Sequence, residues 1–203
     1  MTTPTLTPAQ EQQRKADGKA QVRRQILQRI PQGGHCIEIG VWRGEFTGML
    51  LNRLKPKKLT LIDPWKNFDA REDAFDGKTK DAEFEAIYQS VLDKYAKQIA
   101  SGQIDVRRAL SSEVLAEMAH DSLDFAYLDG DHAYQGVKAD LDAVYPLMKE
   151  GGIIMLDDYH RRGWWGDGVI RAVHEFLGAH PVNLRIFMMR GAQLALEKQK
   201  PSD

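Results

Sequence analysis

Apolar residues recur along the chain with two periods, one typical of strands and the other typical of helices. Short apolar runs typical of buried strands lie at 35–40, 58–63, 104–109, 122–129 and 152–157. Apolar residues at helical spacing occupy the segments 46–54, 84–99, 137–145 and 169–177. Strands that alternate with helices in this way form parallel sheets with helices packed on both faces. The pattern therefore predicts an α/β fold.

The last two strand-like runs, 184–190 and 193–198, are separated by Gly191 and Ala192 and predict an antiparallel hairpin. Together with the five earlier runs they predict a mostly parallel, seven-stranded, Rossmann-like sheet that ends in this hairpin. We expect a single domain over 19–203, with a leading amphipathic helix at 19–30 and a charged insertion at 64–80. Residues 1–18 are polar and are expected to form a flexible tail.

Composition and charge are those of an ordinary globular domain. The 203 residues carry a net charge of −1, and 42% of them are hydrophobic. Charges of both signs are interspersed, which disfavours nucleic-acid binding, and no apolar run approaches the roughly 20 residues of a membrane span. The single cysteine, Cys36, excludes an internal disulfide and a thiolate-rich metal site. We expect a cytoplasmic protein that acts on a small molecule; its oligomeric state stays open, a homo-oligomer included.

The loop after the first strand has features of a nucleotide-binding loop. Its sequence, EIGVWRG, places Gly40 and Gly44 where the backbone turns tightly before a helix. A dinucleotide site needs a glycine at the place of Trp42, because pyrophosphate must approach the backbone there. A phosphate loop needs Gly-Lys-Ser or Gly-Lys-Thr, and the chain contains neither. A ligand with an amino-acid head and no phosphate, such as S-adenosylmethionine, suits this loop. Glu38 could contact its ammonium group or lie behind the residues that do.

Further candidate contacts follow the second and third strands. Asp63 ends the second strand, where a carboxylate can accept hydrogen bonds from ribose hydroxyls, although it can also simply cap the strand. Ser111 and Ser112 are candidates for the adenine edge, and a helix cap is an equal alternative for them. The sequence thus predicts the cofactor contacts Glu38, Gly40, Trp42, Gly44, Asp63, Ser111, Ser112 and Asp129.

Several segments resemble class I S-adenosylmethionine-dependent methyltransferases: EIGVWRG, LIDPW, the stretch from YLDGDHAY to LDDYH, and the terminal hairpin. Within that family they are similar to the branch that pairs DGDHxY with DDY and includes small-molecule and sugar O-methyltransferases. The resemblance covers approximately residues 35–197 and is most specific in the DGDHAY to DDY stretch. It implies S-adenosylmethionine as the methyl donor. The tail and the 64–80 insertion lie outside it, so the acceptor does not follow from it.

Acidic side chains gather after the fourth and fifth strands. Asp129 and His132 follow the fourth strand, and Asp157 and Asp158 follow the fifth. If these strands are neighbours, like charges converge beside the methyl donor and need a positive partner. Oxygen donors without thiolates favour Mg²⁺, Mn²⁺ or Ca²⁺ over zinc. The resemblance to metal-dependent O-methyltransferases implies Asp129, Asp157 and Asp158 as the ligands, although related patterns have Asp-Asn or Glu-Asp where this chain has Asp-Asp.

His132 and Asp129 are the predicted catalytic residues. Methyl transfer to oxygen needs a nucleophile that loses its proton, and a histidine beside a bound cation can accept that proton at neutral pH. His132 matches the position of a proposed base in the sugar-modifying relatives, and a structural histidine that caps the next helix is an equal alternative. Other candidates for the acceptor pocket, which have packing or interface roles as alternatives, are Tyr134, His160, Trp164 and Trp165.

The leading hypothesis is a methyltransferase that uses S-adenosylmethionine and a divalent cation to methylate a hydroxyl of a small molecule. A metal-independent N- or O-methyltransferase is the alternative within the class, with the acids orienting the acceptor directly. From other classes, an NAD-dependent oxidoreductase is disfavoured by Trp42, and a non-catalytic module that binds S-adenosylmethionine stays open.

Overall fold

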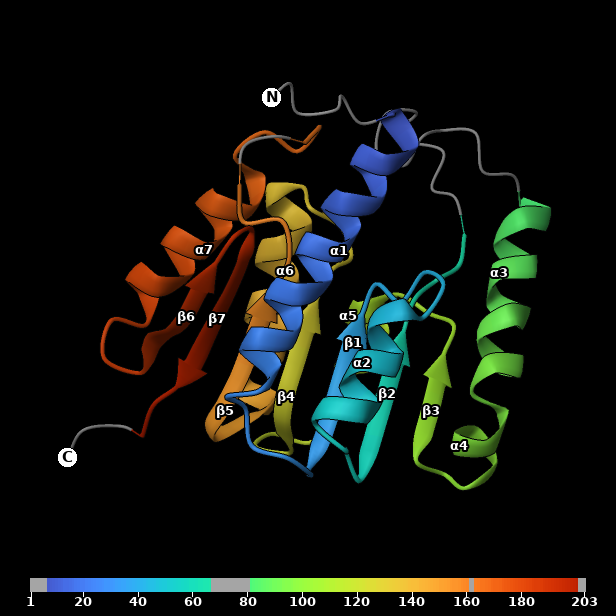
Figure 1. The fold of residues 1–203 in the computed structure, drawn as a ribbon. Coiled ribbons are helices and arrows are strands. Elements are labelled where there is room, and N and C mark those ends of the chain that lie inside the picture. The colour runs from blue at the N-terminus through green and yellow to red at the C-terminus, as the bar shows by residue number, and fades with distance from the viewer. Residues whose placement is uncertain (1–6, 67–80, 161–162, 201–203) are drawn as a thin grey trace.

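The computed structural model describes residues 7–66, 81–160 and 163–200, which form an open sheet with helices on both faces (Figure 1). The elements in chain order are α1 (Pro8–Leu27), β1 (His35–Ile39), α2 (Glu45–Arg53), β2 (Lys58–Ile62), α3 (Asp81–Lys94), α4 (Ala96–Ala100), β3 (Ile104–Arg107), α5 (Ser111–Leu115), β4 (Leu123–Leu128), α6 (Tyr134–Val144), the short 3₁₀ helix η1 (Tyr145–Leu147), β5 (Met148–Leu156), α7 (Gly168–Ala179), β6 (Leu184–Arg190) and β7 (Gln193–Lys198). The predicted α/β fold is confirmed.

The sheet has seven strands in the order β3-β2-β1-β4-β5-β7-β6. The first five strands are parallel to one another, whereas β7 is antiparallel to both β5 and β6. The predicted closing hairpin is therefore confirmed. The order of the strands reverses between β1 and β4, and in open α/β sheets the ligand crevice lies outside the carboxyl ends of the strands at such a point.

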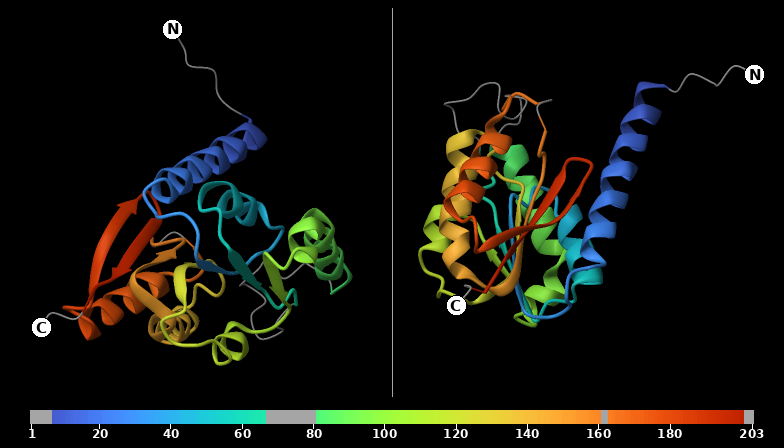
Figure 2. Two further views of the ribbon diagram at one scale, coloured as in Figure 1. Left: turned by 90° about the horizontal axis from the view of Figure 1, so that it is seen from below. Right: turned by 90° about the vertical axis from the view of Figure 1, so that its left-hand side faces the viewer.

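The central strands are buried on both faces, which explains why they appear in the sequence as continuous apolar runs. Cys36, Phe125 and Ile153 lie in register on β1, β4 and β5 and pack in the core beneath α1, α2 and α3. The residue that follows each of them points to the opposite core, beneath α5, α6 and α7. The two helical layers are visible when the sheet is viewed along its strands (Figure 2).

The leading helix differs from its prediction at both ends. We expected it at 19–30, after a flexible tail over 1–18, but α1 runs from Pro8 to Leu27. Thr7 and Gln10 form a capping box at its start, and Pro8 occupies the first turn, so the helix begins without an apolar stripe. Residues 8–18 are exposed, and Figure 2 shows this half of α1 projecting away from the sheet.

Two further predictions concern the segments 84–99 and 64–80. The helix expected over 84–99 is divided at Tyr95 into α3 and α4, and the Tyr95 hydroxyl donates a 2.5 Å hydrogen bond to the carbonyl of Gly44. This bond ties α3 to the loop that follows β1. Most of the 64–80 insertion lies outside the described residues, and no helix within the described ranges is long and apolar enough to cross a membrane.

Candidate active site

The loop after β1 makes backbone contact with the end of β4 at Gly40. Gly40 has a φ of +84°, and a Cβ atom at this position would lie 2.1 Å from the carbonyl oxygen of Asp129. The Asp129 N–H donates a 2.8 Å hydrogen bond to the carbonyl of Ile39 beside this contact. Gly44, with a φ of +67°, forms the N-cap of α2 and lies against the ring of Tyr95. Both glycines are therefore required by the backbone geometry of the crevice.

Asp63 holds the loop in this conformation. Its Oδ2 accepts hydrogen bonds from the backbone N–H groups of Val41 and Trp42, both at 2.9 Å, and its Oδ1 accepts one from Trp65 at 2.7 Å. Burial raises the pKa of the Asp63 carboxyl, although these three donors oppose that shift. A carboxylate has about four lone-pair positions, so one acceptor position is left for a ribose hydroxyl. The predicted ribose contact stays a prediction.

Glu38 lies beneath the loop, with only 1% of its surface exposed. Its Oε2 accepts a 2.6 Å hydrogen bond from the Thr47 hydroxyl of α2, whereas its Oε1 is buried without a hydrogen-bond partner among the described residues. Burial raises the pKa of the Glu38 carboxyl to about 8. A buried, unpaired carboxylate oxygen is costly, and a cationic ligand group would relieve that cost.

The remaining predicted cofactor contacts have identifiable partners. Trp42, with a φ of +51°, uses its carbonyl to accept a 2.9 Å hydrogen bond from the indole of Trp65, and its ring packs edge-on against Phe84. Ser111 begins α5 and donates a 2.6 Å hydrogen bond to Asp140 of α6, and Ser112 is exposed. Both serines lie in the first turn of α5, which follows β3, and their contact with adenine stays a prediction.

The acids after β4 and β5 do converge, and Arg23 of α1 lies between them. One Nη atom of Arg23 donates to Oδ2 of Asp129 at 2.8 Å and to Oδ2 of Asp157 at 2.7 Å. The guanidinium also lies over the rings of Phe46 and Tyr127, 4.9 and 5.3 Å from their centroids. The positive partner that the acidic residues require is thus partly supplied by the protein.

Lys19, one helical turn before Arg23, extends this arrangement. Its ammonium group forms an ion pair with Oδ2 of Asp157 and lies 3.5 Å from Oδ1 of Asp158. The other oxygen of Asp157 accepts a hydrogen bond from the Gln193 side chain of β7. Burial opposes ionisation of Asp157, but Arg23 and Lys19 outweigh it and hold the pKa of this carboxyl well below its ordinary value. Both oxygens of Asp157 are therefore engaged by protein groups.

His132 lies between the other two acids. Its Nε2 atom is 3.6 Å from Oδ1 of Asp129 and 3.6 Å from Oδ2 of Asp158. Ligand atoms of these three residues lie within 4.8 Å of one another, so they could share one metal ion. The structure therefore brings together Asp129, His132 and Asp158, whereas the predicted ligand Asp157 is turned toward α1. Burial lowers the pKa of His132, which keeps its imidazole neutral at neutral pH.

The aromatic candidates divide into two groups. Trp165 stacks near His132 and His160, with ring centroids 4.8 and 5.4 Å apart, and packs edge-on against Trp164. These residues therefore wall the side of the site that contains His132. Tyr134 instead donates a 2.5 Å hydrogen bond to a glutamate of α7, which favours its packing role.

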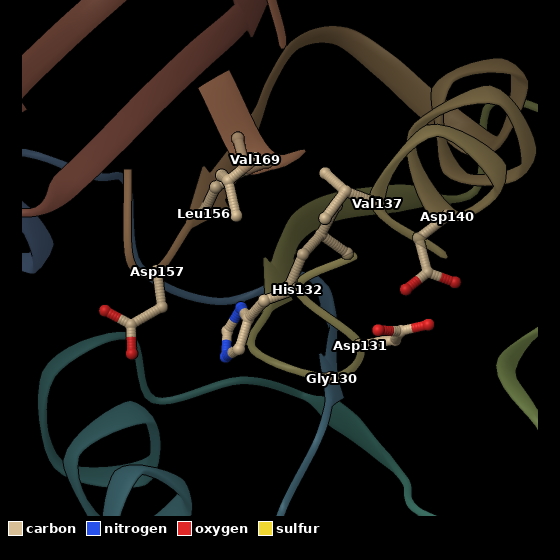
Figure 3. Close-up of a pocket in the computed structure, with 9 residues that line it drawn as sticks. Gly130, Asp131, His132, Val137, Asp140, Leu156, Asp157 and Val169 are labelled. Atoms are coloured by element: carbon tan, nitrogen blue, oxygen red, sulfur yellow. The ribbon is translucent and has the colours of Figure 1, made fainter. Parts of the chain in front are cut away.

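A small cavity lies behind the loop that carries His132 (Figure 3). The imidazole of His132 lies between Asp157 on one side and Asp131 and Asp140 on the other. The cavity volume is about 10 Å³, enough for at most about one water molecule. It is too small for a methyl donor or an acceptor, so we assign it to packing beneath the loop.

The residues that sequence reasoning missed are Lys19, Arg23 and Gln193. Lys19 and Arg23 are four positions apart, which places them on one face of a helix, and both lie within the predicted helix 19–30. That spacing shows that the two cations share one face of the helix, but it does not show that this face lies against the acidic residues.

The fold is that of a class I methyltransferase, as the sequence predicts. A family model described as a methyltransferase domain matches residues 37–159, and the chain belongs to this family. An uncharacterised protein of Acanthamoeba polyphaga mimivirus is 24% identical over 128 residues, which make up 63% of this chain. The match covers 52% of that protein, so the chain spans about half the length of this curated relative.

Solved structures with the same fold include several methyltransferases. A protein from Corynebacterium glutamicum superposes with a TM-score of 0.63 and 16% identity, over 98% of this chain and 94% of that one. A TDP-rhamnose 3'-O-methyltransferase of calicheamicin biosynthesis gives 0.55 and 20%, over 92% and 80%. The O-methyltransferase TomG from Streptomyces achromogenes, in complex with SAM, gives 0.60 and 13%, over 90% and 80%. These similarities concern the fold.

Proposed function

We propose that the protein transfers the methyl group of S-adenosylmethionine to a hydroxyl of a small molecule, assisted by a divalent cation at Asp129 and Asp158. The observation that carries this proposal is the convergence of Asp129, His132 and Asp158 beside the glycine loop of a methyltransferase domain. The presence of small-molecule O-methyltransferases among the structures of the same fold supports a hydroxyl acceptor.

The crevice offers groups that fit each charged part of the donor. The first turn of α2 has no side-chain cap, so its N–H groups can bind the carboxylate of the methionine moiety. The unpartnered Oε1 of Glu38 fits the ammonium group, directly or through water. Asp63 has one acceptor position for the ribose. No phosphate is needed for any of these contacts.

The donor set at the acidic residues also fits a small hard cation. Two atoms that each bind one ion at about 2.0–2.4 Å lie at most about 4.8 Å apart, and the measured separations meet that limit. Mg²⁺ and Mn²⁺ sites often use only one or two carboxylates, with water and substrate oxygens completing the shell. Asp129 and Asp158 are sufficient for such a site, which leaves Asp157 paired with α1.

The chain's own residues then perform the following steps. The glycine loop and Asp63 orient the donor, and the wall formed by Trp165 limits access of water to His132. Neutral His132 accepts the proton of the acceptor hydroxyl at Nε2. The methyl group passes from the sulfonium of S-adenosylmethionine to the hydroxyl oxygen: its C–S bond breaks, the C–O bond forms, and S-adenosylhomocysteine leaves. A divalent cation held by Asp129 and Asp158 would supply the charge that lowers the pKa of the hydroxyl.

Donor binding is tested by calorimetry with adenosylhomocysteine. We expect binding to the wild-type protein and at least tenfold weaker binding to Asp63→Ala, because three backbone hydrogen bonds of the loop are lost. Asp93→Ala removes an exposed acid of α3 and serves as the matched control. If the wild-type protein bound neither adenosylhomocysteine nor S-adenosylmethionine, the proposal would fail at its first step; NAD binding instead would favour the oxidoreductase.

The cation and the base are tested by turnover on panels of hydroxylated and amine acceptors. Activity on hydroxyls that EDTA abolishes and Mg²⁺ or Mn²⁺ restores is the expected result; activity unchanged by EDTA would favour the metal-independent alternative. His132→Ala should lower kcat with little change in Mn²⁺ affinity, whereas a loss of Mn²⁺ affinity would make His132 a ligand. Donor binding without turnover on any acceptor would favour the non-catalytic module.

A further inference from the structure

The acidic residues contact two cations of one helix, and these cations differ in how firmly they are held. Arg23 bridges Asp129 and Asp157, its side chain is 14% exposed, and two aromatic rings cover its guanidinium. The side chain of Lys19 is 40% exposed and reaches Asp157 and Asp158 from the edge of the site. A guanidinium in this setting is fixed, whereas an ammonium on a flexible stem is exchangeable.

The charges of the site show why this difference matters. With all three carboxyl groups ionised, as they are when they bind a metal ion, Asp129, Asp157 and Asp158 face two cations and leave one net negative charge. A bound divalent ion would change this to one net positive charge, which a deprotonated acceptor hydroxyl would neutralise. The same ion at Asp158 would lie close to the Lys19 ammonium, which is 3.5 Å from that carboxylate, and the two cations would repel each other.

The position of Lys19 on α1 allows it to leave the site. The half of α1 before Lys19 is exposed and projects away from the sheet (Figure 2), while the half after it is anchored by Arg23 and by the buried Ile26 and Leu27. Release of Lys19 into solvent therefore breaks its ion pairs with Asp157 and Asp158 and leaves the docking of the helix intact.

We propose that Lys19 is the resident competitor of the divalent cation at Asp129 and Asp158, and that it sets how tightly this cation is held. The inference rests on the cation site of the proposed function. In it, Arg23 is the permanent counter-charge of Asp157, and Lys19 exchanges with the metal at Asp158. Metal affinity is thus set by a residue of the amino-terminal helix, which provides none of the proposed metal ligands.

The test is calorimetric titration of Mn²⁺ into wild-type protein, Lys19→Gln and Lys15→Gln. Lys15 is an exposed lysine one turn earlier on α1, so its variant has the same net charge. We expect Lys19→Gln to bind Mn²⁺ about tenfold more tightly, and Lys15→Gln to bind like wild type. Lys19→Met should behave like Lys19→Gln, which excludes the new amide oxygen as a ligand.

The outcomes separate this inference from the function on which it rests. Unchanged Mn²⁺ affinity in Lys19→Gln, or an equal gain in Lys15→Gln, would overturn the competition while leaving the metal site in place. If Mn²⁺ binds neither to wild type nor to any variant, both the proposed cation site and the inference about Lys19 are refuted. Adenosylhomocysteine binding, measured on the same samples, shows whether each protein is folded and whether the donor site stands independently.

Discussion

Replacement of Gly40 by alanine tests the close contact between the β1 loop and the end of β4. The added Cβ would lie 2.1 Å from the carbonyl oxygen of Asp129 and 2.4 Å from its carbonyl carbon, so the two backbones must separate. The 2.8 Å hydrogen bond from the Asp129 N–H to Ile39 lies at the same place and would stretch. The substitution therefore acts on both fold stability and the shape of the crevice.

Gly33 provides a matched control for the magnitude. It also has a left-handed φ, +90°, but no atom of the residues that the structure describes lies within 4 Å of the Cβ that alanine would add. Gly33→Ala should cost only the conformational penalty, about 1–2 kcal/mol of the free energy of unfolding. Gly40→Ala adds the loss of a buried backbone hydrogen bond, about 1–3 kcal/mol, for a total of about 2–5 kcal/mol.

Urea denaturation of the two variants and the wild-type protein measures this difference, and calorimetry with adenosylhomocysteine measures its effect on the crevice. We expect Gly40→Ala to be less stable than Gly33→Ala by at least about 1 kcal/mol and to bind the ligand more weakly. Equal stability of the two variants, with equal affinity for the ligand, would refute the idea that the β1 loop requires a glycine for its approach to β4.

Three shorter predictions concern ionisable side chains in the protein interior. The pKa of Glu38 is raised from 4.5 to about 8 in the folded state, so the free energy of unfolding should fall as pH rises between these values. Urea titrations at pH 5 and pH 8 should show this fall in the wild-type protein and a smaller one in Glu38→Gln. An equal fall in both proteins would contradict the prediction. Arg23→Met leaves the buried Asp157 and the half-buried Asp129 without their bridge and should lower the free energy of unfolding by about 3–5 kcal/mol, measured by the same method; wild-type stability of the variant would show that the bridge is dispensable. Burial raises the pKa of the Cys36 thiol to about 12, so a thiol reagent at pH 8 should label this residue only after denaturation. Rapid labelling of the native protein would show that the thiol is accessible and ionises in the folded state.

The sheet could be predicted from the sequence because its central strands are buried on both faces. Each of these strands is a short apolar run, and the acids and glycines that follow them mark the carboxyl ends. The start of α1 could not be found from periodicity, because its first half is polar and exposed. The signal was local: Thr7, Pro8 and Gln10 form a helix start that capping rules describe.

The sequence indicates which acidic residues meet at the candidate site, but not which basic residues form ion pairs with them. Strand-end positions were enough to bring Asp129, Asp157 and Asp158 to one edge of the sheet. The requirement for a positive partner was also correct in principle, but Arg23 and Lys19 supply part of it. Which acidic residue each cation contacts depends on how α1 crosses the sheet. The periodicity of a helix indicates which face is buried, but it does not indicate where on the sheet the helix lies.

The contacts of Arg23 also connect segments that are synthesised at different times. They join residues 106 and 134 positions apart, so α1 is synthesised well before the acidic residues that it contacts. Bringing such distant segments together costs loop entropy, and contacts between distant segments form more slowly than local ones. The charged bridge of Arg23 can therefore form only after the chain has been made as far as Asp157, that is, after the synthesis of both β4 and β5.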